Sequence, residues 1–247
     1  YKANNCVITV VGNLGPDPID VTIEDLFSGL GQGPIPDVPD MRIMPSFTNI
    51  KAEEQEEVSV ALMWDVGDYT VDRRLITAVT RILGQNSNSY LNQVLREERA
   101  LSYAAWAILG ELSDRFLFTV TTSVVPEKIN DVIPAMYHAF ERMIEEISEE
   151  DLEVARVEMA TAVETAMEAT DERCSKWNRR YLSEGRVTSN QEIAQEYAQL
   201  TPDMIRSKAI QILTKPLTLG FIGKTDELKL ECFTASRDQF LKKYRQS

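Results

Sequence analysis

Histidine is almost absent from this sequence of 247 residues, in which His138 is the only one. Cysteine is scarce as well, because Cys6, Cys174 and Cys232 lie far apart and form no C-x-x-C pair. A zinc site needs at least three protein ligands, and a catalytic triad needs a histidine between a nucleophile and an acid. We therefore expect the chain by itself to hold no metal and no other cofactor, and to be catalytically inactive.

Positive charge is also in deficit, because 26 lysines and arginines stand against 39 aspartates and glutamates, a net charge of −13. This balance argues against a nucleic-acid partner, which needs a basic surface, and disfavours an anionic membrane surface. No apolar run approaches the ~20 residues of a membrane span, and no signal peptide or glycine-rich phosphate loop is visible. We expect a soluble protein without a membrane span; its compartment, cytoplasmic, periplasmic or organellar, stays open.

Proline marks a division early in the chain. Residues 31–46 contain four prolines, and proline resists regular structure, so this segment is predicted to be an extended linker. Residues 1–30, before the linker, contain an apolar run at Cys6–Val11 that predicts a buried strand. A helix is predicted to follow, with Thr22 as its N-cap.

Residues 47–223, after the linker, are predicted to form an α+β body whose mixed or antiparallel sheet is covered by helices. Apolar patterns predict four strands, the second and third joined as a hairpin, over residues 58–64, 103–109, 116–124 and 217–223. Helical periods predict helices over residues 72–83, 126–147, 151–185 (with a break allowed at Thr170-Asp171), 190–200 and from 202 onward. Residues 224–247 are predicted to be a C-terminal helical extension.

The segment 84–110 carries the candidate site. A polar loop leads into a short helix that ends near Arg99, and an apolar strand begins at Tyr103. Arg96 is therefore expected on the last turn of the helix, where a turn can bring its guanidinium and the phenol of Tyr103 to one side of a sheet. From spacing alone, an alternative stays open: Arg96 pairs with a nearby carboxylate and Tyr103 is half-buried packing, because surface ion pairs are common.

Residues 89–103 read S-Y-L-N-Q-V-L-R-E-E-R-A-L-S-Y. They resemble the pattern S-R-L-F-Q-E-V-R-E-K-R-G-L-A-Y, found in the second half of the pitrilysin, or insulinase-like, zinc metallopeptidases. The matching positions are Ser89, Leu91, Gln93, Arg96, Glu97, Arg99, Leu101 and Tyr103. The family's phenylalanine is Asn92 here and its glycine is Ala100. Alanine is expected to tighten the turn, because glycine tolerates a positive φ and alanine does not.

The resemblance implies a fold that is one half of a two-half clamshell. In this family the other half binds zinc through H-x-x-E-H, which this chain lacks. The chain would be the C-terminal half without metal, which closes the substrate chamber over a peptide, with Arg96 and Tyr103 as auxiliary catalytic residues. Zinc would belong to a homologous partner half, in the same chain or in another subunit, and the parent protein or complex would be a zinc metalloendopeptidase.

Two other functions stay open at this stage. Some members of the family have lost proteolysis, so the chain can instead be an inactive scaffold subunit of the same fold. A third, weaker alternative is an unrelated α+β binding module whose motif is accidental.

A weak internal repeat agrees with two halves. Residues 6–12 read C-V-I-T-V-V-G and residues 217–223 read L-T-L-G-F-I-G, and each is followed by a polar turn and a predicted helix. On this interpretation residues 1–30 are the trailing strand and helix of a preceding half, residues 31–46 connect, and residues 47–223 form the second half. The first residue is Tyr1 rather than methionine, which favours a piece of a longer protein.

Overall fold

The computed structural model describes residues 2–15, 19–35, 43–67, 72–112, 115–165 and 168–245. The chain divides into two compact units. We call residues 43–159 and 193–247 the sheet unit, and residues 1–42 and 160–192 the smaller unit. The described parts of the predicted linker, residues 31–35 and 43–46, contain no helix or strand, and the rest of the linker lies outside the described residues.

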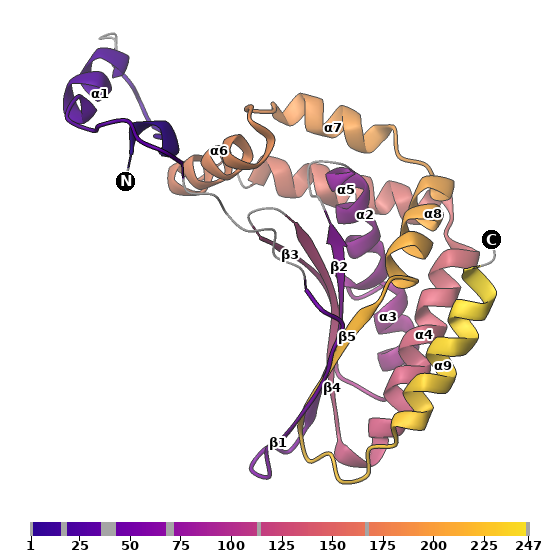
Figure 1. The fold of residues 1–247 in the computed structure, drawn as a ribbon. Helices are drawn as coiled ribbons and strands as arrows, with labels where there is room; N and C mark the ends of the chain where they lie inside the picture. Colours follow the sequence, from indigo (N-terminus) through magenta and orange to yellow (C-terminus); the bar gives the residue numbers. More distant parts are fainter. Residues whose placement is uncertain are drawn as a thin grey trace. The chain divides into compact units, whose positions relative to one another are not determined.

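A five-stranded sheet in the order β1-β5-β2-β4-β3 forms the frame of the sheet unit (Figure 1). The strands are β1 (Phe47–Lys51), β2 (Val58–Gly67), β3 (Ala105–Glu111), β4 (Phe116–Val124) and β5 (Leu217–Gly223). β1 and β5 are parallel and every other neighbouring pair is antiparallel, so the sheet is mixed. The four predicted strands and the β3–β4 hairpin are confirmed. β1 was not predicted, because all five of its residues are exposed and show no alternation of burial.

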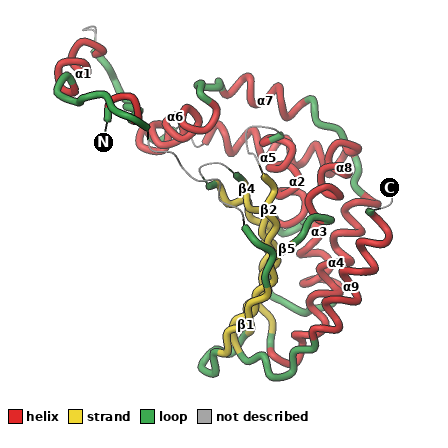
Figure 2. Tube along the Cα trace, in the orientation of Figure 1, coloured by secondary structure: helices red, strands yellow, loops and turns green. Residues whose placement is uncertain are grey.

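Helices cover one face of this sheet (Figures 1 and 2). They are α2 (Arg73–Gly84), α3 (Tyr90–Asn92), α4 (Ile129–Glu146), α8 (Pro202–Leu213) and α9 (Leu230–Tyr244). Alternate residues of β2 point into the interface, where the ring of Trp64 lies 5.8 Å from that of Phe118 and 6.0 Å from that of Phe140. The chain is therefore an α+β protein with a helix-covered sheet, as predicted.

The opposite face of the sheet keeps apolar side chains at its surface. Trp106 and Ile108 of β3 and Ile222 of β5 alternate with buried neighbours and are all exposed. A strand places successive side chains on opposite faces, so these three belong to the face away from the helices.

Two helices replace the long helix predicted over residues 151–185. They are α5 (Glu149–Thr165) and α6 (Thr170–Glu184), followed by α7 (Asn190–Ala198). Ser148 and Asp151 form the predicted capping box at the start of α5: Asp151 accepts from the Ser148 amide at 2.9 Å, and Ser148 Oγ accepts from the Asp151 amide at 3.2 Å. No described helix is both long enough and apolar enough to cross a bilayer.

The smaller unit contains a short 3₁₀ turn, η1 (Ala3–Asn5), the helix α1 (Ile19–Phe27), and α6. One expectation for this region is wrong. α1 is already helical at Ile19, so Thr22 lies inside the helix rather than at its N-cap. Residues 6–11, predicted to be a strand, are extended and pair with no strand among the described residues.

Candidate functional site

The candidate site begins where α2 ends against β3. A Cβ built on Gly84 would lie 2.5 Å from the backbone nitrogen of Ala107 and 2.7 Å from a methyl carbon of Leu91. Only glycine allows the helix end to approach the strand this closely. The chain then forms the loop 85–89 and returns as α3, so α2 and α3 both contact the start of the hairpin.

A π-helical turn follows α3 and carries Arg96. This turn, η2 (Gln93–Glu98), ends with the amide of Arg99 donating to the carbonyl of Val94 at 3.2 Å and the amide of Leu101 donating to that of Leu95 at 2.7 Å. Val94 and Leu95 are fully buried and anchor it. π-turns are rare in proteins, but those that occur often lie at functional sites. The sequence predicted only a short helix here, because apolar spacing does not distinguish a π-turn from an α-helix.

The turn closes at Ala100, which has a positive φ of 47°. We expected alanine to avoid this conformation, and that expectation is wrong. The site keeps the left-handed geometry that the family's glycine favours, and the Cβ of alanine makes that geometry costly. The carbonyl of Ala100 accepts a hydrogen bond from Lys128 Nζ at 2.5 Å, which holds the turn against the start of α4.

Asn92 connects this turn to β3. Its side chain is buried, and its Nδ2 donates to the carbonyl oxygens of Asn86 at 2.9 Å and Ala105 at 3.2 Å and to Ser89 Oγ at 3.0 Å. Its Oδ1 accepts from the Ala105 amide at 3.0 Å. In the sequence Asn92 was noted only as a departure from the family's phenylalanine. The sequence carries no signal of this role, because the burial of Asn92 and its closeness to Ala105 arise only in the folded chain.

Arg96 and Tyr103 come together at the surface. The guanidinium carbon of Arg96 lies 5.8 Å from the centroid of the Tyr103 ring. The Arg96 side chain is 46% exposed and its Nε contacts a carboxylate oxygen of Glu97 at 3.2 Å. Tyr103 is 88% exposed and precedes β3 by two residues. The alternative expectation is therefore correct about an ion pair of Arg96 and wrong about Tyr103, which is not half-buried packing.

Glu98, the other acidic residue of η2, is held by a different arginine. Arg142 of α4 donates to Glu98 at 2.5 Å and to Glu146 at 3.1 Å. Glu98 is thus directed towards α4. Arg96 and Glu97 of η2 and the nearby Tyr103 present a guanidinium, a carboxylate and a phenol to solvent.

The described residues do not fit a zinc site. His138 lies on α4, and among the described residues no group of three or more histidine, cysteine, aspartate or glutamate side chains is placed to hold a metal ion. The metal chemistry that the resemblance implies would have to come from residues outside the described part of this chain.

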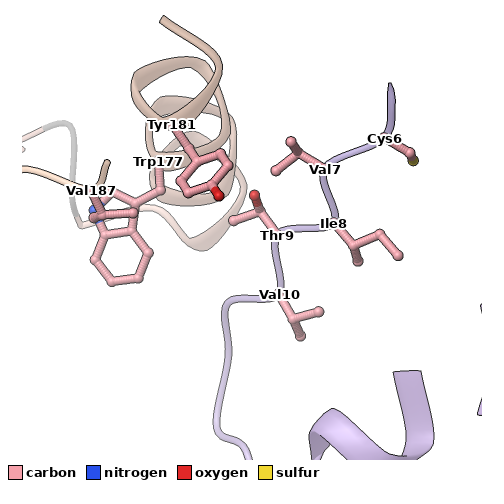
Figure 3. A pocket seen from close by; sticks show the side chains of 8 residues that line it. All are labelled: Cys6, Val7, Ile8, Thr9, Val10, Trp177, Tyr181 and Val187. Atoms are coloured by element: carbon pink, nitrogen blue, oxygen red, sulfur yellow. The ribbon is translucent and has the colours of Figure 1, made fainter. Parts of the chain in front are cut away.

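A separate cavity of about 430 Å³ lies within the smaller unit (Figure 3). Its lining comes from residues 6–10 and from Trp177, Tyr181 and Val187. Arg96 and Tyr103 do not line it, so it is distinct from the candidate site.

The fold and the motif around Arg96 define a helix-covered α+β half of the metallopeptidase type, and comparisons with known proteins agree. The family model of the peptidase M16 inactive domain matches residues 1–159. The chain belongs to this family, the pitrilysin or insulinase-like peptidases, as a C-terminal inactive domain. This membership excludes the alternative of an unrelated α+β module.

Curated relatives carry the name of zinc proteases. An uncharacterized zinc protease of Rickettsia felis is 25% identical over 230 residues, which cover 92% of this chain and 55% of the relative. An uncharacterized zinc protease of Mycobacterium bovis is 22% identical over 231 residues, which cover 90% of this chain and 52% of the relative. The chain thus spans about half the length of the curated relatives it matches.

Solved structures share the fold. The peptidase M16 inactive domain from Pseudomonas fluorescens has a TM-score of 0.75 and 15% identity, over 86% of this chain and 52% of that one. A chain of Complex III2 from Candida albicans has a TM-score of 0.77 and 11% identity, over 91% of this chain and 56% of that one. The same fold therefore occurs in a protein described as a peptidase domain and in a chain of a larger complex.

Proposed function

We propose that this chain is the half of a two-half zinc metallopeptidase that closes over the peptide and presents Arg96 and Tyr103 to the bond being cut. The observation that carries the proposal is the pair itself. A guanidinium and a phenol lie within 5.8 Å of each other, and both are exposed on a turn whose backbone is tightly held. A tyrosine that is 88% exposed buries little of its surface in this chain, so its hydroxyl is accessible to a substrate.

The chemistry of peptide hydrolysis supports these two side chains. Attack of water on the peptide carbon places negative charge on the carbonyl oxygen, and hydrogen-bond donors aimed at that oxygen stabilise the transition state. The phenol of Tyr103 supplies one O–H donor, and Arg96 supplies several directional N–H donors at a permanently charged group. Both side chains donate without first losing a proton.

The zinc and the attacking water belong, in this proposal, to a partner half that carries H-x-x-E-H. The described residues hold no suitable ligand group, and the chain spans about half the length of its relatives, which leaves room for a second half. Residues 1–30 would then be the trailing strand and helix of that preceding half and residues 31–46 the connection between the halves. Residues 47–223 would be the second half, and residues 224–247 its helical extension.

The test is steady-state kinetics of Arg96→Ala and Tyr103→Phe in the complete protein, together with thermal melting. Tyr103→Phe keeps the ring and removes only the hydroxyl. Loss of one oxyanion donor lowers kcat by ~10²–10³ in typical cases. Both variants should melt like the parent protein, because neither side chain is buried. Loss of uniform substrate binding would appear in KM instead.

Arg179→Ala is the matched control, because Arg179 is an exposed arginine on α6 outside the site. The activity of this variant should stay within about two-fold of the parent, a difference of ~0.4 kcal/mol in activation free energy. The proposal fails if Arg96→Ala and Tyr103→Phe also stay within that range. It fails as well if their activity falls only in proportion to lost folded protein.

An inactive scaffold subunit of the same fold is the second candidate function. It is favoured by the fold similarity to a chain of Complex III2 from Candida albicans, which is described as a complex rather than as a peptidase. Sequencing the complete polypeptide and its obligate partner separates the two functions. If neither carries H-x-x-E-H, the scaffold function holds; if one does, cleavage of a fluorogenic peptide should be abolished by a chelator.

A further inference from the structure

Arg142 of α4 reaches both ends of the π-helical turn η2. One terminal nitrogen of its guanidinium, Nη1, donates to Glu98 Oε1 at 2.5 Å. The other, Nη2, donates to Gln93 Oε1 through a longer hydrogen bond of 3.5 Å. Gln93 is the first residue of η2 and Glu98 is the last. A single planar side chain thus bridges the beginning and the end of the turn that carries Arg96.

The spacing of the two bridged residues matches a π-helical turn. Gln93 and Glu98 are related as residues i and i+5, the separation that a π-helical hydrogen bond spans, so they lie about one turn apart on the same side. In an α-helix of about 3.6 residues per turn, the same separation would turn the two side chains roughly 140° away from each other. The bridge therefore favours the π-helical conformation of η2 over an α-helical one.

Both ends of the bridge are fixed. Gln93 Nε2 donates to the carbonyl oxygen of Asn88 at 2.6 Å, in the loop that precedes α3. Arg142 Nε donates to Glu146 Oε2 at 3.1 Å, one turn further along α4. The side chain of Arg142 is only 22% exposed, and α4 is anchored in the core by its buried residues. The bridge thus connects η2 to a helix that cannot shift easily.

The bridge also sets the direction of Arg96. Each residue of a helix rotates the chain by roughly 100°, so side chains two residues apart point to nearly opposite sides. Because Arg142 holds Glu98 against α4, Arg96 is turned away from α4. Its guanidinium carbon lies instead 5.8 Å from the centroid of the Tyr103 ring.

The direct contacts of the Arg96 side chain are weak. Its Nε contacts a carboxylate oxygen of the adjacent Glu97 at 3.2 Å, and both side chains are exposed. Ion pairs between exposed groups contribute little, and so does a cation–π contact with a ring as exposed as that of Tyr103. The conformation of η2 therefore decides where Arg96 points.

We propose that Arg142 is a positioning residue for Arg96: it bridges Gln93 and Glu98, keeps η2 π-helical and so aims Arg96 at the peptide. Arg142 itself does not touch the peptide. The inference rests on the proposed function for the role of Arg96, whereas the effect of the bridge on η2 depends neither on zinc nor on cleavage. The alternative is an ordinary surface ion pair of Arg142, whose removal would leave η2 unchanged.

Glu98 and Glu146 offer a matched pair of variants. Both carboxylates accept from Arg142, and their side chains are 47% and 54% exposed. Glu98→Ala removes one end of the bridge, whereas Glu146→Ala removes a contact within α4 and leaves the bridge in place. If Arg142 makes only ordinary ion pairs, the two variants should behave alike. Both should melt within about 3 °C of the parent, because partly exposed ion pairs contribute little stability.

The first measurement is hydrogen exchange in the complete protein, with EDTA present so that catalysis plays no part. The amides of Arg99 and Leu101 donate the hydrogen bonds that close η2. They should exchange at least ~10-fold faster in Arg142→Met and in Glu98→Ala, because the turn then opens more often. In Glu146→Ala they should exchange at the rate of the parent.

The second measurement is steady-state kinetics of the same variants. Misdirecting a group that acts on the transition state lowers kcat, and a displacement of about 1 Å can cost ~100-fold. Arg142→Met and Glu98→Ala should therefore lower kcat by about 10-fold or more, while KM stays within about two-fold. Glu146→Ala should keep the kcat of the parent. Arg142→Met combined with Glu98→Ala should lower kcat no further than either change alone, since both remove one bridge.

Parent-like exchange of Arg99 and Leu101 in Arg142→Met would overturn the inference. So would equal effects of Glu98→Ala and Glu146→Ala, or faster exchange in Arg142→Met with an unchanged kcat in a protein that cleaves peptide. Faster exchange in Arg142→Met and Glu98→Ala alone, in a protein that cleaves no peptide, would support the bridge while the proposed peptidase function fails. The two failures can therefore be distinguished.

Discussion

Asn92 and Ala105 are joined by two hydrogen bonds of the kind that pair neighbouring β-strands. Asn92 Nδ2 donates to the carbonyl oxygen of Ala105 at 3.2 Å, and the backbone amide of Ala105 donates to Asn92 Oδ1 at 3.0 Å. One side chain thus takes the place of a strand at the start of β3. It also ties the helical turn of Arg96 to the strand that follows Tyr103, so the distance between those two side chains depends on it.

Replacing Asn92 with alanine should lower the free energy of unfolding by ~2–3 kcal/mol. The variant leaves the Ala105 amide and carbonyl buried without this partner, and an unsatisfied buried group costs ~1–3 kcal/mol. Urea denaturation of this chain measures the change. Asn88→Ala, at an exposed position in the same loop, should stay within ~0.5 kcal/mol. Similar losses in the two variants would contradict the role assigned to Asn92.

Ala100→Gly should stabilise the protein. Alanine has a φ of 47° here, and the left-handed region costs a residue with a Cβ ~1–2 kcal/mol. Glycine removes that cost but adds ~0.5–1 kcal/mol of chain entropy in the unfolded state, so the net gain should be about 0.5–1 kcal/mol. Ala104→Gly, at a position without a positive φ, should destabilise instead. A melting temperature of Ala100→Gly below that of the parent would refute this prediction.

Gly84→Ala and Gly220→Ala should have opposite effects. A Cβ at Gly84 would lie 2.5 Å from the backbone of Ala107, which cannot move without shifting β3, so we expect a loss of ~2–3 kcal/mol. A Cβ at Gly220 meets nothing within 4 Å, and alanine in a strand is favoured over glycine by ~0.5–1 kcal/mol. Thermal melts of both variants test this pair, and equal melting temperatures would be the contrary result.

The contact of Glu145 on α4 with Lys243 and Tyr244 on α9 should lose stability in acid. Hydrogen bonds from Lys243 and from the Tyr244 hydroxyl, the latter at 2.9 Å, hold the pKa of Glu145 below its ordinary value of 4.5. A carboxylate with a lowered folded-state pKa adds stability above pH 4.5, and that stability is lost as the pH falls through the lower folded value. Glu145→Gln should therefore cost up to ~1 kcal/mol at pH 7, since the pair is partly exposed, and less at pH 3. Urea melts at the two pH values measure this, and an equal cost at both would exclude the ionic contribution.

The same contact should lose stability in alkali, because the phenol of Tyr244 then loses its proton. Burial, with the hydrogen bond to Glu145, raises the pKa of Tyr244 to about 12. A phenol with a raised pKa adds stability that is complete below its ordinary value of 10.0 and is lost as the pH rises through about 12. Tyr244→Phe should consequently lose less stability than the parent between pH 9 and pH 11.5. A parallel decline of the two proteins in equilibrium melts would contradict this expectation.

Several features of this protein follow from local sequence. The alternation in residues 58–64 and 116–124 and the apolar run 217–223 predict their strands, because side-chain period and burial are coupled within each segment. The capping box of Ser148 and Asp151 is equally local. Residues 89–103 identify the family, and with it Arg96 and Tyr103 as candidates, although the catalytic roles of these two stay a prediction.

Other features depend on partners that are distant in the chain. β1 forms because Phe47–Lys51 pairs in parallel with residues 219–223. Its five residues are all exposed and show no alternation of burial that would indicate a strand. The role of Asn92 appears only when Ala105 and Asn86 surround it, since a hydrogen bond needs both of its groups in place. Ala100 adopts an unfavourable φ because the buried turn before it and the hydrogen bond from Lys128 to its carbonyl fix the backbone in that conformation. The sequence by itself therefore determined the strands β2, β3, β4 and β5, the capping box of Ser148 and Asp151, and the family, where the physical cause lies within a few residues. Tertiary packing alone decided the strained turn, the strand-like asparagine and the exposure of Tyr103, where the cause lies between segments that the sequence keeps apart.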